Sequence, residues 1–179
     1  SDDGESWKER NQRISLPMRG AMEPSIAVLE DGSLRMSMRS RLGSVFLAES
    51  RDAGETWSWP QTTGLKSPES CTVLARVPDS NRLILCWNNS TYVPTHHHYG
   101  LRTPLTLAAS DDGGRQWQVL FDIEDGEYME YTNLSLFFTS EQDAIVTYLE
   151  SEGTPDGTFG RSGMSLKAAK IPASMLRPK

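Results

Sequence analysis

The sequence predicts an all-β fold built from β-propeller blades, and two observations lead to this prediction. The apolar stretches of the 179-residue chain are short and bounded by Gly, Pro, Asp and Asn, without a sustained helical period. A turn string, Ser-x-Asp-x-Gly-x-x-Trp, recurs so that Trp7, Trp57 and Trp117 are separated by 50 and 60 residues. That spacing is typical of one turn per four-stranded antiparallel blade, so the chain should hold about three blades.

Each position of the repeated string has a physical reason. Ser50–Trp57 fits it completely, Ser110–Trp117 fits at Ser, Asp, Gly and Trp, and Asp2–Trp7 is a shorter copy without the first serine. Asp and Ser side chains bind nearby main-chain amides, Gly supplies a positive φ, and Trp packs the turn onto its blade. The string therefore predicts a structural turn, in which Trp57 and Trp117 are buried anchors.

The first elements in chain order form an incomplete blade and a whole one. Residues 1–14 hold the short string and an expected outer strand at Lys8–Ile14. The next blade spans residues 22–62, with strands expected at 25–30, 34–40 and 45–50 and a fourth near Trp59. Asp31-Gly32, between two alternating runs, predicts a tight hairpin.

The remaining chain is predicted to form two further blades within one domain of residues 1–179. The blade at 68–124 has expected strands at 71–77, 82–88, 104–110 and 118–123, and the last, at 128–176, has strands at 133–139, 144–150 and 165–171. His96-His97-His98 lies in a long loop at the rim, where we expect no metal, since no Cys/His set has zinc spacing.

The two cysteines lie on strands predicted to form one hairpin. A turn at Pro78–Asn81 pairs Val73 with Cys86 and leaves Cys71 diagonal to it. Because a disulfide between diagonal positions is strained, we expect two buried thiols.

The charge of the chain bears on its partners. The 24 acidic residues outnumber the 18 basic ones, for a formal charge of −6, which opposes attraction to nucleic acid or an anionic membrane. No apolar run reaches membrane-spanning length, and no basic and apolar leader opens the chain. We expect no nucleic acid, membrane or cofactor, and a secreted or periplasmic location only if a leader precedes Ser1.

The repeated strings resemble the Asp boxes of sialidases and other proteins with bacterial neuraminidase repeats. In that family the box joins the third and fourth strands of a blade in a six-bladed propeller, away from the substrate. The resemblance covers nearly the whole chain, which looks like the C-terminal half of such a protein. It implies the fold first, because Asp boxes also occur in propellers that are not sialidases.

Four residues match the family's site. Met22-Glu23-Pro24-Ser25-Ile26 and the run ending at Arg39 are similar to the stretch in which a Glu opens one inner strand and an Arg ends the next strand. Leu101-Arg102-Thr103-Pro104 resembles the segment of a second Arg, and Glu130-Tyr131-Thr132 resembles the Tyr-Ser/Thr step. The resemblance implies Tyr131 as nucleophile, Glu23 as its base, and Arg39 and Arg102 as carboxylate ligands.

Alternatives remain open at two of these positions. Arg41 competes with Arg39, and Tyr128 competes with Tyr131, whereas Tyr148 and Glu150 are expected to be packing and edge residues. Guanidinium groups suit the carboxylate of a sialic acid, and a neutral tyrosine is not repelled by it. The implied function is a retaining exo-α-sialidase type of glycoside hydrolase, or a fragment of one, acting on a terminal acidic sugar.

The alternative function is a non-catalytic carbohydrate-binding or assembly module. The family's first arginine and its acid/base Asp have no match in this chain, and loss of an acid lowers a rate by about a hundredfold or more. Three blades alone would also leave apolar faces open, so we expect a possible homodimer that completes a propeller.

Overall fold

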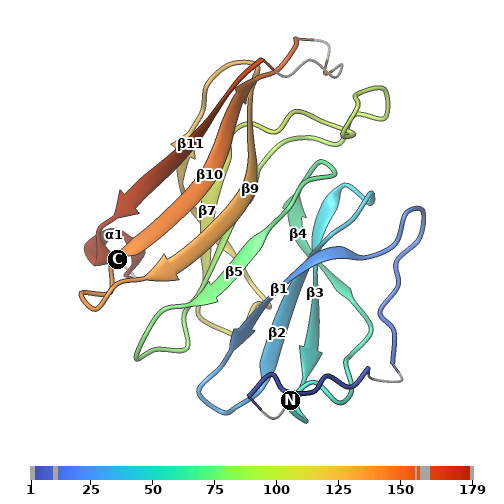
Figure 1. The fold of residues 1–179 in the computed structure, drawn as a ribbon, viewed down its shortest axis with the longest axis vertical. Helices are drawn as coiled ribbons and strands as arrows, with labels where there is room; N and C mark the ends of the chain where they lie inside the picture. The colour runs from blue at the N-terminus through green and yellow to red at the C-terminus, as the bar shows by residue number, and fades with distance from the viewer. Residues whose placement is uncertain (1–2, 10–11, 156, 158–161, 178–179) are drawn as a thin grey trace.

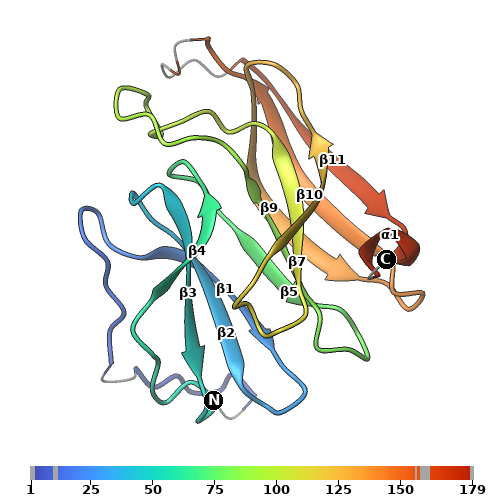
Figure 2. The same cartoon turned by 180° about the vertical axis from the view of Figure 1, so that it is seen from behind.

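Three antiparallel sheets lie side by side in the computed structural model, which describes residues 3–9, 12–155, 157 and 162–177. The described residues form eleven strands and one short helix (Figures 1 and 2). The first strands of the sheets, β1, β5 and β9, are neighbours, since β1 contacts β5 and β5 contacts β9. This is the arrangement of successive propeller blades with adjacent inner strands, and it confirms the all-β propeller prediction.

The first sheet has the order β1-β2-β3-β4. Its strands are β1 Met22–Val28, β2 Leu34–Arg39, β3 Ser44–Ser50 and β4 Gln61–Lys66. The Asp31-Gly32 hairpin is present, because the Asp31 carboxylate accepts the Ser33 amide at 2.9 Å and Gly32 has φ of 81°.

The second sheet has the order β5-β6-β7-β8. Its strands are β5 Val73–Arg76, β6 Leu83–Asn88, β7 Leu105–Ser110 and β8 Gln118–Glu124. Val73 pairs with Cys86 as predicted, and both cysteines are free thiols. Cys86 is buried and Cys71 is only half-buried, and burial raises the pKa of the Cys86 thiol.

The described part of the third sheet has three strands, as expected for the last blade, in the order β11-β10-β9. They are β9 Met129–Phe138, β10 Ala144–Glu152 and β11 Ser162–Ile171. After β11 the chain forms α1 Ala173–Leu176, whose Leu176 is buried in the core.

The prediction of an outer strand at Lys8–Ile14 is wrong for the described residues of this segment. Residues 8–9 and 12–14 form no strand, and 10–11 lie outside the described residues. The Gln12 side chain instead bonds the main chain of Trp57, accepting its amide at 2.6 Å and donating to its carbonyl at 2.7 Å. The physical reason is that this segment pairs with no strand of the described chain.

Two apolar cores fill the spaces between neighbouring sheets. In β6, Ile84 and Cys86 point to the core shared with the third sheet, whereas Leu83, Leu85 and Trp87 point to the core shared with the first. Because β6 is covered on both faces, its sequence is a continuous apolar run rather than an alternating one.

The Asp boxes connect β3 to β4 and β7 to β8. In the first, the Ser50 hydroxyl donates to Asp52 at 2.8 Å and accepts the Gly54 amide at 2.9 Å. Ser110, Asp112 and Gly114 repeat both distances.

Two residues of the short N-terminal string repeat backbone angles of the first complete box. Asp3 and Gly4 have φ values of 55° and 89°, against 55° and 85° at Ala53 and Gly54. The side chains of this string differ, because Trp7 is exposed.

The prediction that Trp57 and Trp117 are buried is wrong, because both are half-buried. Each packs against an apolar cluster with part of its indole. The turns lie at the ends of the sheets, where solvent reaches the rest of the ring.

Candidate functional site

The candidate site lies at the end of the molecule where the inner strands begin. Met22 at the start of β1 pairs with Arg39 at the end of β2. The Ser25 hydroxyl accepts the Leu74 amide at 2.9 Å, which places the start of β5 beside the start of β1. Since β3 and β7 run away from this end, the Asp boxes that follow them lie at the opposite end.

Glu23 and Arg39 form one contact of the site. Nη1 of Arg39 donates to both oxygens of the Glu23 carboxylate, at 3.0 and 3.2 Å. Glu23 has φ of 48°, in the left-handed region that residues other than glycine seldom occupy. Such strain at the start of an inner strand is typical of functional positions.

A buried glutamate, Glu69, joins three arginines at this end. Its side chain is 1% exposed. Nη1 of Arg19 and Nη2 of Arg39 lie 3.1 and 3.5 Å from its Oε1, and Nε of Arg41 lies 3.0 Å from its Oε2. A carboxylate buried among guanidinium groups is held in one position and in turn fixes their geometry.

The fourth arginine, Arg102, reaches the main chain of the same residue. Nη2 of Arg102 donates to the Glu69 carbonyl at 3.3 Å, and the Glu69 amide donates to the His98 carbonyl at 2.8 Å. The site thus holds four guanidinium groups, from Arg19, Arg39, Arg41 and Arg102, against the two carboxylates of Glu23 and Glu69. It carries an excess of positive charge.

The sequence left Arg39 and Arg41 as alternatives, and the structure brings both to Glu69. The Arg41 guanidinium also lies 4.6 Å from the centroid of the Tyr99 ring, and Tyr99 stacks on Tyr92 with centroids 5.5 Å apart. The cation–π contact holds Arg41 from a second side. This long loop between β6 and β7 therefore shapes the site.

Tyr131 is placed next to Arg102 through the main chain. The Tyr131 amide donates to the Arg102 carbonyl at 3.0 Å, and the buried Asn88 amide group donates to the carbonyls of both residues. The Tyr131 side chain is 1% exposed. Its hydroxyl accepts the Gly126 amide at 3.1 Å. Tyr128, the alternative, is exposed, and the hydrogen bond that its hydroxyl donates to the Glu127 carboxylate raises its pKa.

Charged residues of the second and third sheets act on Tyr131. Tyr148 meets it edge to face with centroids 5.9 Å apart and donates to Glu124 at 2.5 Å. Lys167 donates to Glu124 at 2.6 Å and to Glu150 at 2.8 Å. Burial raises the pKa of Tyr131, and the nearby carboxylates add to the rise, while the Gly126 amide and Lys167 oppose it.

Sequence reasoning missed Glu69 and Arg19. A signal for Glu69 was present, because Pro68-Glu69 stands before the inner strand β5 much as Glu23-Pro24 opens β1. Arg19 lies in a loop without a motif, and only its contact with Glu69 identifies it.

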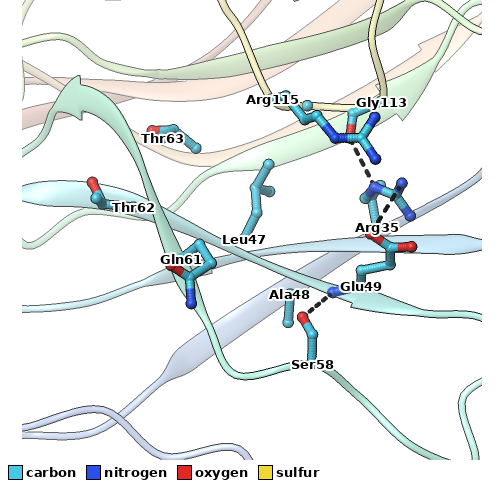
Figure 3. A pocket seen from close by; sticks show the side chains of 11 residues that line it. Arg35, Leu47, Ala48, Glu49, Ser58, Gln61, Thr62, Thr63, Gly113 and Arg115 are labelled. Carbon is cyan, nitrogen blue, oxygen red and sulfur yellow. Dashed lines mark hydrogen bonds and ion pairs between the residues drawn. The ribbon is translucent and has the colours of Figure 1, made fainter.

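A cavity of about 320 Å³ lies away from this site, beside an Asp box. Figure 3 shows Arg35 of β2 at one side of the cavity, where its Nε donates to the Gly113 carbonyl at 2.7 Å and its Nη2 pairs with Glu49 at 3.3 Å. Arg35 thus ties the second Asp box to the neighbouring blade.

Among the described residues, no group of three or more His, Cys, Asp or Glu side chains is arranged to hold a metal ion. No described helix has the length and apolar character needed to cross a membrane.

Antiparallel blades with an Asp box between the third and fourth strands define a protein of the sialidase-like β-propeller class. The chain belongs to the family of BNR repeat-like domains, whose sequence pattern matches residues 1–146. No curated protein matches the chain.

Solved structures share the fold at low sequence identity. The leech intramolecular trans-sialidase superposes with a TM-score of 0.72 at 20% identity, over 98% of this chain and 27% of that one. The NanB sialidase from Streptococcus pneumoniae gives 0.70 at 18% identity, over 98% of this chain and 27% of that one. The α-L-arabinanase of Penicillium chrysogenum superposes with a TM-score of 0.59 at 17% identity, over 89% of this chain and 48% of that one. The chain therefore spans about a quarter of the length of the two sialidase relatives.

Proposed function

We propose that this protein acts as a sialidase-like glycoside hydrolase on terminal acidic sugars. The observation that carries the proposal is the excess of guanidinium groups gathered at the inner-strand end around Glu69. Guanidinium groups bind a carboxylate in a planar, bidentate manner and keep their charge at any working pH. A sugar carboxylate is the ligand that such a site suits.

In this proposal Tyr131 is the nucleophile and Glu23 is its base, while Arg39 and Arg102 bind the substrate carboxylate. The Tyr131 hydroxyl oxygen accepts the Gly126 amide, so the hydroxyl proton stays available for donation to a base. As the phenolic oxygen bonds to the anomeric carbon, its proton passes to Glu23. The leaving oxygen departs with the bonding electrons and takes a proton from an acid, a role not assigned within residues 1–179.

A second function, a non-catalytic carbohydrate-binding module, is favoured by one observation. The Tyr131 side chain is 1% exposed, so a substrate atom reaches its hydroxyl only after a local movement. Such a module would keep the arginines and bind the same acidic sugars without hydrolysis. We also propose that two copies associate, with support from apolar side chains exposed on the first and third sheets, Ile26, Val28, Phe137, Met164 and Leu166.

Hydrolysis of an aryl α-sialoside tests the proposed enzyme, with an aryl arabinofuranoside as the neutral-sugar comparison. Tyr131→Phe should lower the sialoside rate at least about 100-fold while circular dichroism shows an intact fold. Tyr128→Phe, the matched control, should keep the rate of the unchanged protein. An unchanged rate in Tyr131→Phe would remove Tyr131 from the mechanism, and calorimetric binding without any hydrolysis would favour the module.

A further inference from the structure

The loop between β8 and β9 brings a glycine against the hydroxyl of Tyr131. The Gly126 amide donates to the phenolic oxygen at 3.1 Å, across five residues of chain. The amide of Met129 in turn donates to the Gly126 carbonyl at 3.2 Å and closes the turn. The contact is therefore made by the phenol of Tyr131 itself.

The close approach requires glycine at position 126. A Cβ atom there would lie 2.6 Å from the Tyr131 hydroxyl oxygen and 2.6 Å from Cγ of Met129. The Tyr131 hydroxyl has little room to retreat, because its ring is buried against Tyr148. Gly126 lies outside the left-handed φ region, so the reason is contact and not backbone conformation.

The same loop is tied to the segment that carries Arg102. The Thr103 hydroxyl donates to the Gly126 carbonyl at 3.0 Å, and the Arg102 carbonyl accepts the Tyr131 amide at 3.0 Å. Gly126, Tyr131 and the Arg102 segment therefore form one hydrogen-bonded unit. A displacement of the loop would move the phenol relative to the arginines.

We propose that Gly126 is a positioning residue for Tyr131. The main-chain amide of Gly126 holds the phenolic oxygen of Tyr131 at the site. This inference rests on the proposed role of Tyr131 as nucleophile. An amide donor stabilises the anionic phenolate more than the neutral phenol, as donors do in oxyanion holes.

The amide matters because the surroundings of Tyr131 otherwise oppose its ionisation. Burial is the largest effect, and the carboxylates of Glu124 on β8 and Glu150 on β10 add to it, while Lys167 on β11 counters them. Tyr148 donates to Glu124, and its ring and that of Tyr131 meet edge to face. The Gly126 amide acts directly on the phenolic oxygen.

The test replaces Tyr131 with difluorotyrosine, whose phenol ionises at a lower pH, and follows its ¹⁹F resonance through a titration. Gly126→Ala should raise the apparent pKa of this phenol by about one unit, a tenfold change in its ionisation constant. Thr103→Val, the control, removes the bond to the Gly126 carbonyl and leaves the amide, so it should change the pKa much less. An unchanged pKa in folded Gly126→Ala would overturn the inference.

A second measurement needs no substitution at Gly126. In the protein with difluorotyrosine at position 131, the ¹H shift of the Gly126 amide should titrate with the same pKa as the fluorine signal. A Gly126 amide that does not follow the phenol would also overturn the inference, even if Gly126→Ala fails to fold. Neither readout uses hydrolysis, so a protein without sialidase activity would refute the proposed function and still test the role of Gly126.

Discussion

Nε of Arg41 lies 3.0 Å from Oε2 of the buried Glu69, and the two residues come from different blades. Arg41 follows β2 of the first sheet, whereas Glu69 precedes β5 of the second. The ion pair therefore joins neighbouring blades at the end where the candidate site lies. Because Glu69 also contacts Arg19 and Arg39, the arrangement of the arginines depends on it.

Glu69→Gln should destabilise the protein by about 3 kcal/mol, because loss of a buried carboxylate leaves neighbouring guanidinium groups without compensation. Breaking a buried ion pair costs about 3 to 5 kcal/mol. The low end of this range applies here, since the Arg19 side chain is 54% exposed. Urea unfolding measures the change. Glu23→Gln is the control, and because its side chain is half exposed, it should cost no more than about 1 kcal/mol. Equal losses in the two variants would contradict this account of Glu69.

Trp117→Ala should lower the free energy of unfolding by about 2 kcal/mol, below the loss of about 3 to 5 kcal/mol for a fully buried aromatic residue. The reason is that its half-buried ring contributes only part of its surface to the core. Thermal or urea unfolding gives the value. Affinity for an acidic sugar, measured on the folded variant, should not change, because the Asp box lies at the end opposite the arginines.

The Asp boxes should contribute to acid stability through Asp52. The Thr56 hydroxyl and amide, followed by the Ser50 hydroxyl, lower the pKa of Asp52 below its ordinary value of 3.8. A lowered folded-state pKa contributes stability that is present above this ordinary value and is lost as the pH falls through the folded value.

Unfolding curves collected from pH 7 down to about pH 3 test this contribution. Asp52→Asn should show a smaller loss of stability in acid than the unchanged protein. Glu55→Gln, in the same turn, should keep the original profile. An identical acid limb in Asp52→Asn would show that this carboxylate does not contribute.

Light scattering tests the proposed association of two copies. Leu166 is 77% exposed on the outer face of the third sheet, and Ile26 and Val28 are exposed on β1. We expect a dimer at micromolar concentration, and Leu166→Lys should weaken it because a charge would enter an apolar interface. Lys170→Ala, elsewhere on β11, should leave the dimer intact. A stable monomer on dilution would refute the pairing.

Elements with local causes were predictable from the sequence. The Asp-box turns close through hydrogen bonds among eight consecutive residues, as Ser50, Asp52 and Gly54 show. The pairing of Val73 with Cys86 follows from the length of the turn between them. Strand positions follow from short apolar runs between turn residues, and the resemblance of the Glu, Arg and Tyr motifs selected one end of the blades.

Only the tertiary structure determined which of these residues touch. Glu69 and Arg19 are 50 residues apart, and no period or spacing links them. The half-burial of Trp57 and the absence of a strand at its neighbour Gln12 depend on what packs beside the first sheet. Hydrogen bonds within a turn are encoded by adjacent residues, whereas contacts between blades depend on how whole sheets pack, and the latter place Glu69 among its arginines.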